Sequence, residues 1–285
     1  MSPSDTRLHA DEPLIPYVHI PTFRLLGQPV HIFTFLAMAA IAVTYVLAQR
    51  RVRAVGLYAP IGAGALLYTA MFGFIGAHVF EVLAYHPHKV LERPVLLIEI
   101  WSGMSSFGGF IGGLAGMHYH CRRHGVWTLA YLDAFVFGFA PGWIIGRLGC
   151  FLAHDHPGVH SDFFLAVDYP GGARHDLGLY EVLLAVALTV LLYALPRRER
   201  FVGFYTALVI GIYAPVRFAL DFLRVADRRY LGLTPAQYLC VAMLGLSVWL
   251  VVRGRRARDV VDEGGAALQR GDEDDDASRR EADDS

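Results

Sequence analysis

Two arginines stand in apolar surroundings, where a guanidinium charge is costly unless a partner or a ligand uses it. Arg147 lies near the end of an apolar run and is followed by the polar sequence His154-Asp155-His156. Arg217 lies in a second apolar run and precedes Asp221 and Arg224 at the i+4 and i+7 positions, which share one helix face. Because ionisable residues inside membrane segments mark functional sites by default, both arginines need an explanation.

The chemistry that two such arginines suit best is phosphate binding. Guanidinium forks match phosphate oxygens and stabilise charge that builds on a phosphate leaving group. The structural alternative is an internal ion pair between Arg217 and Asp221 that only holds a helix in place. We favour a cavity with Arg147 opposite Arg217, suited to a lipid phosphate headgroup. Glu99 and Glu181 are acids near the outer ends of their apolar runs, on the side of the membrane assigned below as extracytoplasmic. Both are expected to pair with arginines on that side.

The histidine-rich loop after Arg147 allows a second chemistry. With Asp155, the side chains of His154, His156 and His175 could ligate zinc, or one histidine could act as a general base near neutral pH. The spacing matches no strong zinc motif, and a hydrated loop is the third interpretation. The three cysteines are scattered, at Cys121, Cys150 and Cys240. They form neither a disulfide framework nor a Cys-x-x-Cys metal site. The residues alone leave these three interpretations of the histidine-rich loop open.

The composition places these residues in a membrane protein. Of the 285 residues, 55% are hydrophobic and 18% are charged, and the mean hydropathy is +0.40. A soluble domain of this length is rarely so apolar. The net charge of -1 carries little information, because an acidic tail offsets basic loops. Membrane lipid is therefore an expected partner and nucleic acid is not.

Apolar runs long enough to cross a bilayer predict the elements that position the site. There are seven, at roughly 30–48, 56–84, 95–117, 127–152, 178–195, 201–222 and 234–252. Arginine clusters follow every second run, beginning with the first, so the positive-inside rule puts the N-terminus outside and the C-terminus in the cytoplasm. Arg224 falls on the outer side, against this rule, which suggests an anionic ligand. The first run is expected to direct insertion itself, without a cleaved signal peptide.

The predicted fold class is thus an all-α polytopic membrane protein with seven transmembrane helices. Residues 1–28 are expected to form an extracytoplasmic or interfacial segment, residues 29–252 the transmembrane domain, and residues 253–285 a disordered, charged cytoplasmic tail. The run at 95–117 is rich in glycine, including Gly108 and Gly109. These glycines indicate either close helix packing or a broken helix whose backbone N–H groups face a polar ligand, and the sequence leaves both open.

Five stretches that follow one another along the chain carry a likeness to known motifs. They are Trp101-Ser102-Gly103-Met104-Ser105 with Gly108-Gly109, Gly146-Arg147-Leu148-Gly149-Cys150-Phe151, Arg174-His175 with Leu179-Tyr180-Glu181, Arg217-Phe218 with Asp221-Phe222, Arg224 and Asp227, and Leu233-Thr234 with Gln237. The second is similar to Gly-Arg-[Ile/Leu]-Gly-Asn-Phe, and the fourth to Arg-Phe-x-x-Glu-Phe-x-Arg-x-x-Asp. On these motifs, the chain resembles the prolipoprotein diacylglyceryl transferase family over all but its two tails.

The resemblance implies a function and a place in the cell. Family enzymes transfer a diacylglyceryl group from phosphatidylglycerol to the lipobox cysteine thiol of prolipoproteins, forming a thioether and releasing glycerol phosphate, without a metal or other cofactor. The implied partners are phosphatidylglycerol and the signal peptides of prolipoproteins. The implied location is the bacterial inner (cytoplasmic) membrane, with the active site toward the outer face.

The site residues that we predict on this basis fall into two groups. The catalytic group comprises Arg147, Asp155, Arg217, Asp221 and His154. The substrate-binding group comprises Gly108, Gly109, Gly146, Gly149, Cys150, Arg224 and Tyr180.

The chain also departs from the family pattern at several motif positions. The family histidine before the paired glycines is Phe107 here, the asparagine after Gly-Arg-x-Gly is Cys150, and an early tyrosine is Phe33. Aspartate replaces glutamate at Asp155 and Asp221, and His154 or His156 is the candidate replacement for the missing histidine. Two alternatives follow: a diverged paralogue that binds or transfers anionic lipid without this activity, and a His/Asp metal-dependent membrane hydrolase.

Overall fold

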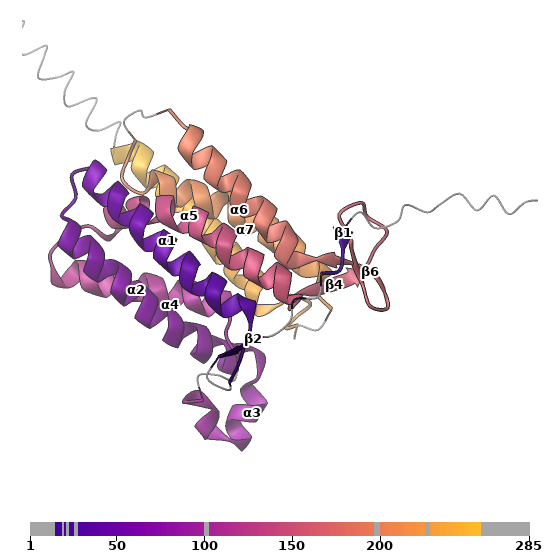
Figure 1. Cartoon of the computed structure of the whole chain (residues 1–285). Helices are drawn as coiled ribbons and strands as arrows, with labels where there is room; N and C mark the ends of the chain where they lie inside the picture. Colours follow the sequence, from indigo (N-terminus) through magenta and orange to yellow (C-terminus); the bar gives the residue numbers. More distant parts are fainter. Residues whose placement is uncertain are drawn as a thin grey trace, which may run out of the picture.

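Long helices packed side by side make up most of the molecule (Figure 1). The computed structural model describes residues 15–18, 20, 23–25, 28–99, 103–196, 200–225 and 229–257. Within these residues, six helices are long and apolar enough to cross a membrane: Ile32–Ala54, Ala59–Tyr85, Thr128–Ala153, Leu177–Ala194, Phe204–Leu223 and Pro235–Ala257. Large apolar side chains are exposed all along them, as expected of helices that face lipid. The prediction of a helical, polytopic membrane protein is confirmed.

The helices are joined by short elements at one end of the bundle. The long helices are α1 (Ile32–Ala54), α2 (Ala59–Phe80), α4 (Ser106–Arg123), α5 (Thr128–Ala153), α6 (Leu177–Ala194), α7 (Phe204–Leu220) and the last helix, Pro235–Ala257. The short ones are η1 (Glu81–Tyr85), α3 (Pro87–Glu92), η2 (Pro94–Leu97) and η3 (Asp221–Leu223). The last helix continues past residue 252, so the predicted tail begins inside it. Residues 258–285 and 1–14 lie outside the described part.

The apolar run predicted at 95–117 takes a different form in the structure. Its first residues belong to η2, and the helix α4 begins only at Ser106 and continues to Arg123. Gly103 has a φ of +142°, a conformation that a helix does not contain and that L side chains rarely adopt. The helix therefore starts later than the hydropathy pattern indicates. Because the shifted helix ends in histidines and arginines, it is not among the six most apolar helices.

Glycines bring α4 into backbone contact with α2, and the two helices lie side by side (Figure 1). A Cβ atom placed on Gly108 would lie 2.3 Å from the backbone oxygen of Gly76, and one on Gly112 would lie 2.1 Å from that of Phe72. A Cβ on Gly116 would meet α2 at 2.4 Å. This stripe is the helix-packing alternative of the sequence analysis, because α4 is a continuous helix at these positions.

Helix α5 is the centre of the bundle and packs against α1, α6 and α7. Its glycines face α1: a Cβ on Gly142 would lie 2.0 Å from the Thr44 hydroxyl oxygen, and one on Gly149 would lie 3.0 Å from the Phe33 ring. On α5, Asp133 accepts hydrogen bonds from the backbone N–H groups of Gly203 and Thr206, at 2.7 and 2.8 Å. This aspartate therefore caps the start of α7 and fixes it to α5.

A small sheet covers the end of the bundle where α5 ends and α6 begins (Figure 1). Its strand order is β1 (Ile15–Pro16), β5 (Val167–Tyr169), β6 (Gly172–Asp176) and β4 (Pro157–His160), with β1 parallel to β5 and the other pairs antiparallel. A separate hairpin pairs β2 (Phe23–Leu25) with β3 (Gln28–Val30). The prediction of an all-α fold and of a plain loop after α5 missed this sheet. Its strands are too short for an alternating pattern, and one of them comes from a distant segment.

Candidate active site

A buried glutamate connects the two arginines that the sequence analysis singled out. Glu181, just after the first turn of α6, lies 2.9 Å from Arg147 Nη2 through Oε2 and 3.6 Å from Arg217 Nε through Oε1. The three residues are 2–4% exposed. Buried charges of this kind persist only when they are paired, so α5, α6 and α7 are held together at one point by this carboxylate. Arg147 and Arg217 therefore contact the same carboxylate, and the cavity between them stays a prediction.

Helix α5 and the start of α4 build the surroundings of Arg147. Its Nη2 donates a hydrogen bond to the Ser106 hydroxyl at 3.1 Å, and its Nη1 lies 3.9 Å from Cys150 Sγ, one helical turn further on. The guanidinium carbon lies 4.4 Å from the centre of the Trp143 ring, in a cation–π contact. Arg147 Nε has no hydrogen-bond acceptor among the described residues.

Arg217 also has an ion-pair partner on its own helix. Its Nη2 lies 2.8 Å from Asp221 Oδ1, at the i+4 position where α7 passes into η3. The other Asp221 oxygen accepts a hydrogen bond from the Thr234 hydroxyl. The Phe107 ring centre lies 5.7 Å from the guanidinium carbon, at the position of the family histidine. The ion pair given as the structural alternative therefore exists, and it is one side of the larger cluster.

A capping box holds the Thr234 partner in place. The Thr234 backbone N–H donates to the Gln237 side-chain oxygen at 3.0 Å, and the Gln237 N–H donates to the Thr234 hydroxyl at 3.1 Å. This reciprocal pair starts the last helix. Since the Thr234 hydroxyl also contacts Asp221, the start of the last helix determines how that carboxylate faces Arg217.

The cluster is neutral by count but keeps free donors. Two guanidinium groups, of Arg147 and Arg217, face the carboxylates of Glu181 and Asp221. Among the described residues, nothing accepts a hydrogen bond from Arg217 Nη1 or Arg147 Nε, although both atoms are buried. Buried donors without acceptors are unfavourable. These are the donors of the cluster that its own ion pairs leave unused.

Asp155 and His156 follow directly after α5, close to Cys150. One potential ligand atom from each of these three residues lies within 4.8 Å of the other two. Partial burial raises the pKa of Asp155 to about 6 and outweighs the Arg147 cation, although 42% of the side chain is exposed. Burial, together with the Arg147, Arg224 and Arg217 charges, lowers the pKa of His156 to about 3. His156 is therefore neutral at physiological pH.

His154 lies in the packing of the sheet instead of in the arginine cluster. It ends α5 in the left-handed conformation, with a φ of 51°. Its Nε2 lies 3.1 Å from the Val18 backbone oxygen, its Nδ1 lies 3.5 Å from Asp176 Oδ2, and its ring stacks on Tyr17 at 4.0 Å. These contacts join β1 and the N-terminal segment to the end of α5. The group of His154, His156 and His175 considered for a metal is not one of the ligand groups found among the described residues.

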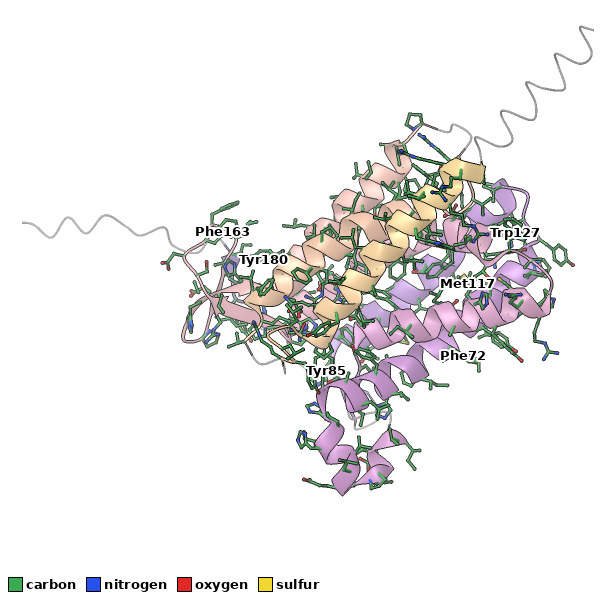
Figure 2. The ribbon with its side chains drawn as sticks, turned by 180° about the vertical axis from the view of Figure 1, so that it is seen from behind. Phe72, Tyr85, Met117, Trp127, Phe163 and Tyr180 are labelled. Atoms are coloured by element: carbon green, nitrogen blue, oxygen red, sulfur yellow. The ribbon has the colours of Figure 1, made fainter. Side chains whose placement is uncertain are left out.

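The remaining predicted residues occupy separate places. Tyr180 and Phe163 lie at the sheet end of the bundle, with Trp127 at the opposite end (Figure 2). The Tyr180 hydroxyl contacts His175 Nδ1 at 2.6 Å, and the Arg224 backbone bridges to β4.

Glu99 and the predicted glycines make contacts with residues other than the two arginines. Glu99 pairs with Arg93 at 2.5 Å, outside the cluster. The glycines proposed for substrate binding line contacts between helices. Gly108 and Gly109 face α2, whereas Gly146 and Gly149 face α1.

Three residues of the cluster were not among the predicted site residues. Glu181 had a signal, because it is an acid at the start of an apolar run and was expected to pair with the outer arginines; the structure confirms that pairing. Thr234 had a weaker signal in the spacing to Gln237. Ser106 had none, since its role depends on a contact with α5 that is distant in sequence.

This fold and this site define a polytopic helical membrane protein with a buried double-arginine cluster at one end of its bundle. A sequence model for the family described as prolipoprotein diacylglyceryl transferase matches residues 21–253. Three proteins named phosphatidylglycerol–prolipoprotein diacylglyceryl transferase are each 32% identical to the chain. That from Nitratidesulfovibrio vulgaris aligns over 67% of this chain and 76% of its own length. Those from Chromohalobacter salexigens and Allorhizobium ampelinum align over 80% and 86% of this chain, and over 89% and 93% of their own lengths. The chain belongs to the prolipoprotein diacylglyceryl transferase family.

Proposed function

We propose that this protein transfers a diacylglyceryl group from phosphatidylglycerol to the cysteine thiol of prolipoproteins. The names of its relatives supply the substrates. The observation that carries the proposal is the cluster in which Arg147 and Arg217 share Glu181 while each keeps a buried N–H donor free. Such donors suit the phosphate of a lipid headgroup.

The reaction is a displacement at the carbon of the diacylglyceryl group that carries the phosphate. The acceptor sulfur forms a bond to this carbon, the carbon–oxygen bond breaks, and glycerol phosphate leaves with the electron pair. Arg147 and Arg217 stabilise the charge that develops on the phosphate oxygens. Asp221 and Glu181 are positioning residues, because they hold the two guanidinium groups in place.

The acceptor thiol must lose its proton during the reaction. Asp155 is the side chain we assign to this role, because it is a carboxylate at the edge of the cluster with a pKa of about 6. A base with a pKa near the working pH is the effective kind. His154 is a less suitable base, since its ring nitrogens face Val18 and Asp176. We place His154 in a structural role, with Cys150 and Arg224 beside the substrate.

We also infer the arrangement in the membrane. The seventh span is α4, which packs along α2 and has arginines in its last turn, like α1. Arginine-rich ends then lie in the cytoplasm, the N-terminus lies outside, and residues 29–252 with the rest of the last helix form the transmembrane domain. The cluster faces the outer side of the inner membrane. A reporter fused to the C-terminus that is active only in the cytoplasm tests this orientation.

Complementation tests the activity. Expression of the chain in a bacterium depleted of its own transferase should restore growth and the lipid modification of a reporter prolipoprotein, whereas Arg217→Ala should not. A purified assay with phosphatidylglycerol and a lipobox peptide should give the thioether and glycerol phosphate. A well-expressed, correctly inserted protein that gives neither product nor complementation would exclude this activity. A protein that retains phosphatidylglycerol without converting it would instead be a lipid-binding relative.

A further inference from the structure

The position where the family signature has asparagine holds a thiol in this chain, and two further metal-ligand types lie next to it. Cys150 occupies the last turn of α5, and the chain leaves the helix through the left-handed His154. This turn carries Asp155 and His156 back over the end of the helix. A sulfur, a carboxylate oxygen and an imidazole nitrogen then lie within 4.8 Å of one another.

We propose that Cys150, Asp155 and His156 bind a thiophilic divalent cation of the zinc class. Three protein ligands of the sulfur, oxygen and nitrogen types, with a fourth position left to water, are a set that zinc accepts in tetrahedral sites. Tetrahedral coordination needs ligand atoms closer than 4.8 Å, so binding requires movement of the turn after the helix, where Asp155 is exposed and His156 is half-buried. The site shares Cys150 and Asp155 with the proposed transfer site, so a bound ion and the base role of Asp155 exclude each other.

Two contacts bear on the ligands. The buried Nδ1 of His156 has no hydrogen-bond partner among the described residues. Arg147 Nη1 lies 3.9 Å from the Cys150 sulfur, so its charge offsets part of the cost of placing a thiolate there. Binding exchanges the thiol proton for the metal, so one proton passes to solvent for each ion bound and no electron is transferred.

The surrounding cations are the main opposing force. The charges of Arg147, Arg217 and Arg224 act on His156 and would also act on a bound cation. Arg147 is paired with Glu181, and Arg217 with Asp221 as well as Glu181. The Cys150 thiolate and the Asp155 carboxylate together neutralise a doubly charged ion. The site is therefore electrically feasible at the edge of the cluster.

Cobalt spectroscopy of the purified full-length protein tests the proposal without an activity assay. Titration with Co²⁺ should give a thiolate-to-cobalt charge-transfer band and the visible bands of four-coordinate cobalt, and Zn²⁺ should remove both. Cys150→Ser should lose the charge-transfer band. The matched control is Cys121→Ser, which removes a buried thiol of α4 and should keep the band. No band in the unmodified protein, or a band that persists in Cys150→Ser, would overturn the proposal.

A second variant covers the case in which Cys150→Ser does not fold. His156→Gln should still give the charge-transfer band at saturating Co²⁺, but with an affinity lowered about tenfold or more, the scale at which even outer-shell partners act. Unchanged cobalt affinity in His156→Gln would contradict the site. Binding should also weaken as the pH falls, because protons compete for the thiolate.

Discussion

The Glu181 carboxylate lies 2.9 Å from the Arg147 guanidinium, and only 2% of Glu181 is exposed. The contact joins α6 to α5 across 34 residues of sequence. The same carboxylate reaches Arg217 on α7, at 3.6 Å. One side chain thus holds both phosphate-binding candidates, and the arginines depend on it for their burial.

Replacement of this carboxylate should therefore destabilise the protein. Glu181→Gln leaves two buried guanidinium groups with one carboxylate fewer, and removing one partner of a buried pair costs about 3–5 kcal/mol. The thermal midpoint in detergent, measured by the loss of monodisperse protein, should fall. The control is Glu99→Gln, because Glu99 pairs with an Arg93 side chain that is 63% exposed, and it should change the midpoint little. Equal midpoints for the two variants would contradict the bridging role.

The geometry of Arg217 should matter beyond its charge. Arg217→Lys keeps a cation but loses the second Nη group, so it cannot both pair with Asp221 and donate to a phosphate. We expect transfer from phosphatidylglycerol to a lipobox peptide to fall about 100-fold, the scale of losing one oxyanion donor. The loss should appear mainly in kcat, since the donor acts on developing charge. Arg253→Lys, at the far end of the last helix, serves as control. Wild-type rates in Arg217→Lys would contradict the proposed role of Arg217 in phosphate binding.

The transfer rate should depend on pH through Asp155. Burial raises the pKa of this carboxyl to about 6. A general base acts in its deprotonated form, so kcat/KM should be low below pH 6, rise through it, and level off above it. Asp155→Asn should remove this limb and slow the reaction at the plateau. If the limb at pH 6 is identical in Asp155→Asn, a different group accepts the proton. His156, with its pKa lowered to about 3, is not expected to titrate in this range.

The glycine stripe between α2 and α4 should be intolerant of any side chain. A Cβ on Gly112 would lie 2.1 Å from the Phe72 backbone oxygen, so Gly112→Ala must separate the helices. Overpacking of this kind costs about 1–3 kcal/mol, and the thermal midpoint should fall accordingly. Gly245→Ala is the matched control, because nothing lies within 4 Å of its added Cβ and alanine favours helix. A stable Gly112→Ala protein would mean that α2 and α4 are not in backbone contact.

Much of the site could be read from single positions and local spacing. Arg147 and Arg217 are conspicuous because a charge in an apolar run is costly without a partner or a ligand. Arg217 and Asp221 have the i, i+4 spacing of a helical ion pair, and they form one in the structure. The pairing of Glu181 followed from its place at the start of an apolar run. Ser106 and the sheet position of His154 could not be read in this way, because each depends on a partner from a distant segment.

The sequence by itself determined the membrane class, the positions of most of the long helices, the two arginines and the family motifs. Hydropathy, helical spacing and short motifs are local properties, so each is written in consecutive residues. Only the tertiary structure decided that Glu181 lies between the arginines, that the glycines of α4 face α2, and that the polar loop after α5 forms a sheet with β1. These features are contacts between segments far apart along the chain, and their energies come from burial and charge pairing that arise only once the helices have packed.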